Sequence, residues 1–138
     1  MIMYPSVTVY AGPYPVPDPV SMLTREVGGG SLNAYTPGVT GGIGVHNTGL
    51  LIQVSGRVTY VNTLSKYFYA DDGFGRQDGS GNTGVLVHCG GRPLGADTII
   101  LPGLDTYVTA TGISSRKLSG GNYVPMIRPR KQSYIVGY

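Results

Sequence analysis

The chain has 138 residues, of which 12% are charged and 41% are hydrophobic, and it carries a formal net charge of +3. This length is that of one domain with its own core, and the hydrophobic content excludes a disordered chain. With 23 glycines among its residues, the chain has the composition of a β-protein with many tight turns. No apolar run approaches the ~20 residues of a membrane-spanning helix, so membrane insertion is not expected.

Residues 1–46 show no helical periodicity, and we predict that they form an extended arm. Ser6–Tyr10 is rich in β-branched and aromatic residues, as in a strand. Alternating prolines from Pro13 to Pro19 predict an extended, polyproline-like chain. Val20–Val27 is a second short strand candidate, and the glycines that follow predict loop. The arm docks either on its own domain or on a neighbouring copy. The expected contact residues are Val7, Thr8, Val9 and Tyr10.

Residues 47–138 carry the strand patterns of a second, compact unit, and no stretch has the 3.6-residue periodicity of a helix. Ile52, Val54 and Val58 share one face of the first strand and are expected to point inward. Gly56 interrupts that strand and predicts a sharp bend or bulge. The predicted strands are Leu50–Val61, Lys66–Asp71, Val85–Cys89, Thr106–Ile113 and Tyr123–Ile127, with Ser133–Val136 as a further pairing segment.

Three stretches, Gly49–Val58, Phe68–Gly75 and Tyr107–Ile113, resemble the oligonucleotide/oligosaccharide-binding (OB) fold. The middle one, with its strand followed by Asp-Asp-Gly-x-Gly, is similar to single-strand DNA-binding OB domains of the replication protein A type. The second half as a whole is similar to OB-like domains of exported bacterial surface proteins. The resemblance implies an all-β, five-stranded Greek-key OB-fold barrel over residues 47–138, with residues 1–46 as the arm. Residues 90–103 replace the helix that such folds carry between strands three and four.

OB domains bind ligands on the outer face of strands two and three. Aromatic rings there stack on bases and cations hold phosphates, which is the chemistry of single-strand binding. The alternative is that the two tyrosines pack against cross-strand neighbours or under the arm. The candidate ligand or partner face consists of Gln53, Arg57, Tyr67, Tyr69 and His88.

Three carboxylates, Asp71, Asp72 and Asp78, lie in or beside one glycine-rich loop. Such a loop offers the oxygen ligands that Ca²⁺ prefers, so calcium is the candidate cofactor. In the other interpretation the acids accept backbone N–H bonds and fix the turn. No spacing typical of a zinc site, a nucleophile elbow or a phosphate-binding loop is present, and we expect no enzyme activity.

Two functions from different classes remain. The first is a structural or interaction module that forms homo-oligomers, or filaments, when the N-terminal strand of one copy adds to the sheet of the next. The second is a single-stranded nucleic-acid-binding protein, and a glycan is a further candidate ligand.

The single cysteine, Cys89, is expected to be buried on a strand. No signal-peptide pattern is visible, yet low charge and abundant glycine favour an exported, extracellular or cell-surface protein.

Overall fold

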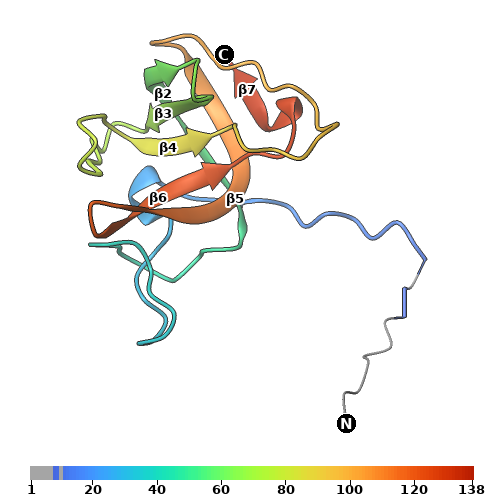
Figure 1. Cartoon of the computed structure of the whole chain (residues 1–138), viewed down its shortest axis with the longest axis horizontal. Helices are drawn as coiled ribbons and strands as arrows, with labels where there is room; N and C mark the ends of the chain where they lie inside the picture. The colour runs from blue at the N-terminus through green and yellow to red at the C-terminus, as the bar shows by residue number, and fades with distance from the viewer. Residues whose placement is uncertain (1–7, 10) are drawn as a thin grey trace.

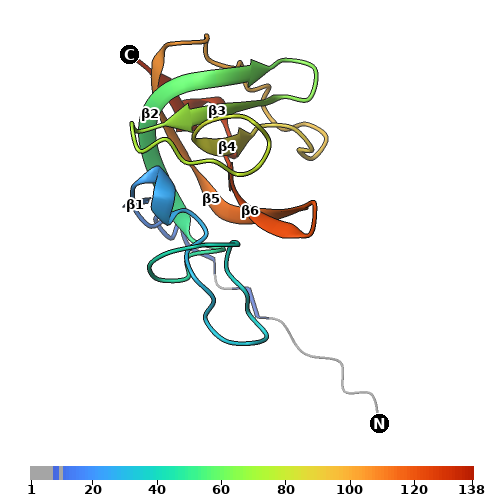
Figure 2. The same ribbon diagram turned by 90° about the vertical axis from the view of Figure 1, so that its left-hand side faces the viewer.

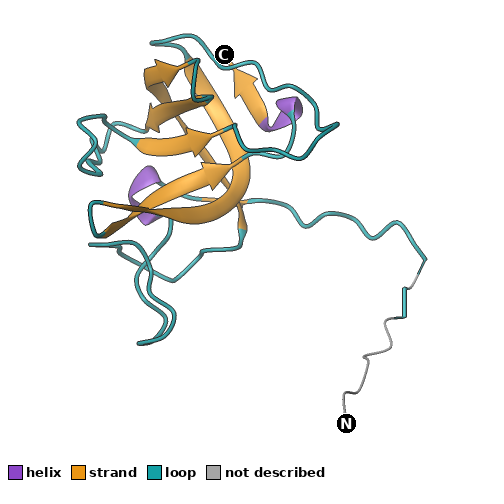
Figure 3. Ribbon diagram, viewed as in Figure 1, coloured by secondary structure: helices purple, strands orange, loops and turns teal. Residues whose placement is uncertain are grey.

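The computed structural model describes residues 8–9 and 11–138, and within them the prediction of an all-β fold is confirmed. Seven strands form one mixed sheet, joined by long loops (Figures 1 and 3). Two short 3₁₀ helices, η1 (Thr24–Glu26) and η2 (Gln132–Tyr134), lie near the ends of the described chain. The strands are β1 (Val20–Ser21), β2 (Leu51–Asn62), β3 (Tyr67–Asp71), β4 (Val85–His88), β5 (Tyr107–Ser119), β6 (Asn122–Arg128) and β7 (Ile135–Gly137).

The strand order is β1-β2-β3-β4-β6-β5-β7, and an additional pairing of β2 with β5 closes the sheet partly into a ring. We predicted a five-stranded barrel, and the sheet has seven strands because β1 and β7 add at its edges. These two strands overlap the further candidates of the sequence analysis, Val20–Val27 and Ser133–Val136. The segment between β4 and β5, residues 89–106, holds no helix, in agreement with its glycine and proline content. Among the helices that the structure describes, none has the length and apolar character needed to cross a membrane.

The ring depends on two long strands that each pair with different partners along their length. Residues 51–57 of β2 pair with β5, and residues 57–62 pair with β3. In the same way β5 pairs with β2 up to Ile113 and with β6 from Ile113 onward. Each strand curves through its switch point, as Figure 2 shows for β2 and β5. The observed strand β5 is therefore longer than the predicted strand Thr106–Ile113, since it continues along β6.

A glycine precedes each switch point, because another part of the backbone comes too close for a side chain. A Cβ on Gly56 would lie 2.5 Å from the carbonyl oxygen of Asp71. A Cβ on Gly112 would lie 2.6 Å from the carbonyl carbon of Arg128. Only glycine allows backbone to approach backbone this closely.

The core lies inside the ring and follows the alternation of the strands. Ile52, Val54 and Val58 are buried on the inner face of β2, as predicted. The bend that we expected at Gly56 lies beside the switch point of β2, and a register shift follows it between Val58 and Tyr60. This shift reverses the alternation, so that Tyr60 packs with the outer-face residues of β3 and β4 and Val61 packs against the core.

We predict that Gly112→Ala destabilises the protein by about 1–3 kcal/mol, because the new methyl group overlaps the backbone of β6. Urea unfolding measures the change through the transition midpoint at constant slope. Gly137→Ala is the matched control, since a Cβ there meets nothing within 4 Å. Equal midpoints for the two variants would contradict the account of the switch point.

Candidate functional site

An aromatic cluster covers the outer face of β3 and β4. Its ring centroids lie 5.9 Å apart for Tyr60 and Tyr67, 6.2 Å for Tyr67 and Tyr69, and 6.3 Å for Tyr67 and His88. The imidazole of His88 is stacked on Tyr67, with an interplanar angle of 11°. The structure thus brings together three of the five residues predicted for the ligand face. The two tyrosines, Tyr67 and Tyr69, also join Tyr60, Leu86 and Met126 in a second apolar cluster outside the ring.

Tyr69 is the most enclosed aromatic residue of this cluster and is 4% exposed. Its hydroxyl donates a hydrogen bond of 2.7 Å to Oδ2 of Asp78, in the loop that follows β3. Burial and the neighbouring carboxylate raise the pKa of Tyr69 to about 12. Tyr69 therefore contributes more to holding the loop on the sheet than to an open stacking surface, whereas Tyr67 and His88 stay partly exposed.

The other two residues predicted for this face have different neighbours. Gln53 lies on β2 where it pairs with β1 and β5, and its amide donates a hydrogen bond of 3.1 Å to Oγ1 of Thr111. Arg57 lies at the switch point of β2, and its guanidinium is 3.5 Å from the carboxylate of Asp105. The partner changes along β2 separate these side chains from the tyrosines, although all of them share the outer face.

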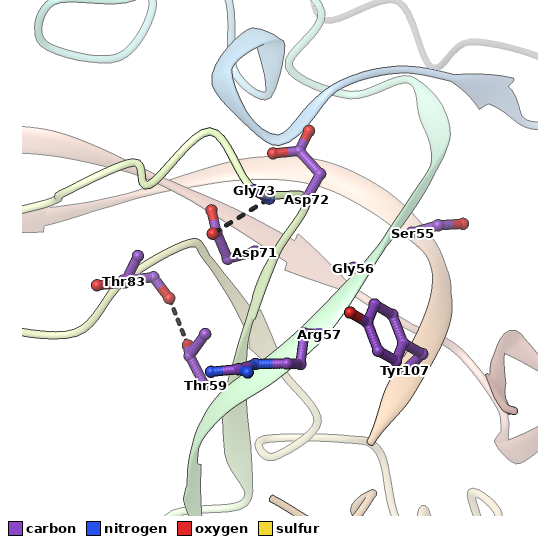
Figure 4. Close-up of a pocket in the computed structure, with 9 residues that line it drawn as sticks. All are labelled: Ser55, Gly56, Arg57, Thr59, Asp71, Asp72, Gly73, Thr83 and Tyr107. Carbon is purple, nitrogen blue, oxygen red and sulfur yellow. Dashed lines mark hydrogen bonds between the residues drawn. The ribbon is translucent and has the colours of Figure 1, made fainter. Parts of the chain in front are cut away.

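A pocket of about 640 Å³ opens beside Arg57, between β2, the end of β3 and the start of β5 (Figure 4). Its lining combines hydroxyl groups with one cation, Arg57, and the ring of Tyr107, which is 61% exposed. Asp71 faces Gly73 at its rim, while the Asp72 side chain points away toward the N-terminal part of the chain. The pocket is a polar hollow, distinct from the aromatic cluster.

The three acids predicted as calcium ligands are engaged in internal hydrogen bonds. Asp71 accepts from the N–H groups of Gly73 and Gly75, which fixes the turn after β3. Asp78 accepts from Tyr69 and from the N–H of Ser80. Across the described residues, no three His, Cys, Asp or Glu side chains gather in a way that could hold a metal ion. The geometry matches the interpretation of these acids as turn-forming residues.

Asp72 connects the loop after β3 to the N-terminal part of the chain. Its carboxylate accepts hydrogen bonds from the N–H and the hydroxyl of Thr24, at 2.9 and 2.7 Å. Burial raises the pKa of Asp72, but the hydrogen bonds from Thr24 and Phe74 outweigh it and lower the pKa below its ordinary value. A few residues along, the Arg76 guanidinium donates to the carbonyls of Thr24 and Arg25 at 3.0 and 2.9 Å. We call residues 20–47, which these bonds hold to the sheet, the strap.

Asn47 closes the strap at its other end with a fully bonded side chain. Its Oδ1 accepts from the N–H of Gly28 and from the hydroxyl of Ser114, both at 2.7 Å. Its Nδ2 donates to the carbonyls of Glu26 and Val45. Because every polar atom of this buried amide is paired, Asn47 fixes the strap to β5 without a desolvation penalty.

The predicted arm of residues 1–46 thus divides into two parts. The strap pairs with β2 through β1 and places Val27 in the core. Before β1, residues 16–18 line a pocket with Leu50, Ile113 and Tyr134, and residues 11–15 run away from the sheet (Figure 1). Of the predicted contact residues, Thr8 and Val9 are exposed, Val9 at 85%, and neither is part of a strand. Val7 and Tyr10 lie outside the described residues.

Sequence reasoning missed the residues that tie distant segments together. Asn47, Thr24 and Arg76 act through hydrogen bonds to partners 19 to 67 positions away in the chain. Tyr60 was missed because strict alternation from Val58 places it inward, and only the register shift turns it out. The one signal in the sequence was the position of Asn47 shortly before β2, because an asparagine at the end of a strand can cap or bridge backbone groups.

Comparisons of the chain with protein-family models, with curated proteins and with solved structures found no match.

We predict that Asp72→Ala releases the first part of the strap, because it removes both hydrogen bonds to Thr24. Amide hydrogen exchange at residues 22–28 should accelerate roughly tenfold or more, since each such bond contributes about 1–3 kcal/mol. Asp71→Ala is the matched control, because the adjacent carboxylate bonds only within its own turn. Equal exchange rates in the two variants would contradict the role of the Asp72–Thr24 hydrogen bonds in holding the strap.

The stabilisation of the strap by the Asp72 carboxylate has a defined pH dependence. Since the folded-state pKa of Asp72 is lowered, its contribution to stability is present above its ordinary value of 3.8 and is lost as the pH falls through the folded value. Protection of residues 22–28 in the unchanged protein should therefore fall in acid before the protection of β2.

Proposed function

We propose that this chain is a non-catalytic interaction module with an OB-type barrel, which assembles with other copies of itself through the N-terminal segment that precedes the strap. The observation that carries the proposal is the exposed apolar chain before β1, which leaves from a base that hydrogen bonds hold in place. The proposal has two parts, the barrel and the arm, and each has its own support.

The OB-type barrel is supported by the order in which strands pair around the ring. Taking β2 to β6 as strands one to five, the order is one, two, three, five, four, and strand four returns to strand one. β4 and β6 pair in parallel, and the other neighbours in the ring are antiparallel. This arrangement agrees with a partly open Greek-key barrel. The strap and β7 are then additions to that barrel.

The arm is supported by its composition and exposure. The first 17 residues contain no charged side chain. Tyr14 and Val16 are 76% and 60% exposed, in addition to Val9. Apolar side chains in such an extended segment gain free energy when another surface covers them. The prolines restrict the segment to extended conformations, which lowers the entropic cost of ordering it on a partner.

The strap makes this arm useful for assembly. β1 pairs with Ile52 and Gln53 of β2, and Asp72 and Arg76 bond to the residues just after it. The arm therefore leaves the barrel at a fixed point and in a fixed direction. A segment that adds to a sheet of another copy from such a point binds through backbone hydrogen bonds, with side-chain pockets setting the register.

A second candidate function, binding of single-stranded nucleic acid, has one observation in its favour. Tyr67 and His88 form a partly exposed stack, and burial together with the nearby Arg128 and Lys117 cations lowers the pKa of His88. Aromatic stacks beside cations bind single strands. Salt-sensitive binding of a short oligonucleotide that Tyr67→Ala abolishes would favour this function over assembly.

We predict that removal of residues 1–17 abolishes self-association while the barrel stays folded, because β1 and the strap remain. Sedimentation velocity over a range of concentrations should show a rising sedimentation coefficient for the full chain and a constant one for the shortened chain. Urea unfolding at a protein concentration at which both chains are monomeric should give the same midpoint for both.

A chain of the same length with residues 1–17 in scrambled order is the matched control for the loss of bulk apolar surface. It should associate less than the natural sequence, since the strand-like stretch Ser6–Tyr10 is broken up. Undiminished association of the shortened chain would refute assembly through the arm.

A further inference from the structure

The sheet has two different edges, β1 and β7, and they offer different possibilities for pairing. In one half of the ring the strands pair in the order β1-β2-β5-β7, so β1 and β7 are its two edge strands. β1 has two residues, and Pro17 and Pro19 precede it without backbone N–H groups to donate. β7, Ile135–Gly137, is the edge at which a further strand can add.

The direction of the backbone groups of β7 follows from its pairing with β5. The N–H of Tyr138 donates to the carbonyl of Tyr107 at 2.9 Å, so these two residues form a hydrogen-bonded pair. Gly137 is opposite Val108, the next pair along. In an antiparallel ladder such pairs alternate with non-bonded ones, so the N–H and C=O of Gly137 point away from β5. These groups are available to a strand that lies along the outer side of β7.

The surroundings of this edge suit an uncharged, apolar strand. A groove of about 300 Å³ lies between β7 and the segment 100–103, and none of its lining residues is charged. Apolar side chains beside it are exposed, among them Ile100 at 73%, Val136 at 46% and Tyr138 at 81%. The sequence offers a matching partner in composition, because the side chains of the first 17 residues also lack charge.

We propose that the outer edge of β7 accepts the N-terminal segment Ser6–Tyr10 of a second copy as an added strand, with apolar side chains of that segment filling the groove at residues 100–103. This inference rests on the proposed function and names the acceptor site for the arm. The arm leaves from the β1 side and the acceptor lies on the β7 side, at the opposite edge of the same half of the ring. The contact is therefore head to tail, and repeated contacts build an open chain of copies where the rotation between neighbours does not close into a ring.

Gly137→Pro in the full chain tests the acceptor edge directly. It removes the N–H that points away from β5, whereas the bonds from β7 to β5 do not use that group. We expect the dissociation constant for self-association, measured by sedimentation velocity, to rise roughly tenfold or more. Gly137→Ala keeps the N–H and has open space for its methyl group, so its dissociation constant should rise less than that of Gly137→Pro.

Disulfide trapping between two differently substituted chains supplies a readout of position. One chain carries Thr8→Cys or Val9→Cys, and the other carries Val136→Cys. Because neighbouring positions of a strand face opposite sides, one of the two arm positions should crosslink to Val136→Cys under mild oxidation and the other should not. The natural Cys89 is buried, which raises its pKa to about 12 and keeps it out of the reaction.

The outcomes separate this inference from the proposed function. If removal of residues 1–17 abolishes association but Gly137→Pro does not, and no crosslink forms, the arm binds elsewhere and the β7 acceptor is wrong. If neither change affects association, assembly through the arm is wrong as well. Weak association of Gly137→Pro together with a crosslink at one arm position supports both.

Discussion

Two strands that each serve both halves of the ring set the shape of this protein. β2 and β5 pair with each other over one half of their length and then turn to separate partners, β3 and β6. The turn is sharp enough to press backbone against backbone, and Gly56 and Gly112 stand at the two positions where a side chain does not fit. The buried core, the outer aromatic cluster and the pocket beside Arg57 all follow from this crossing.

The strap converts the N-terminal part of the chain from a tether into a fixed element. Asn47, Asp72 and Arg76 bind it with side-chain hydrogen bonds to backbone groups that a strand ladder does not satisfy. Such bonds stabilise weakly on balance but are costly to leave unmade in the interior, so they define one arrangement. The chain that precedes the strap consequently starts from a defined place, and under the proposed function this gives the extended apolar segment a direction in which to bind.

The strands were predictable from sequence because local patterns determine them. Alternating β-branched residues gave β2, β3 and β4 within one or two residues, and inward-facing Ile52, Val54 and Val58 were identified correctly. The length of β5 was not predictable, since residues 114–119 are polar or basic apart from Leu118 and become a strand through their partner β6. Docking of the strap on its own domain was one of two alternatives that the sequence left open, because its glycines indicate loop while its order comes from long-range hydrogen bonds. The aromatic cluster was foreseen in Tyr67, Tyr69 and His88, but the register shift that adds Tyr60 is a tertiary effect.

The structure is a barrel-like sheet with a buried core. We propose that it interacts with other copies at its edges, through a projecting arm on the β1 side and an uncharged strand edge on the β7 side. Isotope-filtered NMR of a mixture of two differently labelled preparations of the full chain tests this picture most directly, because it detects only contacts between copies. The account predicts contacts from the arm of one copy to β7 and residues 100–103 of another. A mixture that associates without any contact between arm and β7, or one that remains monomeric at high concentration, would contradict it.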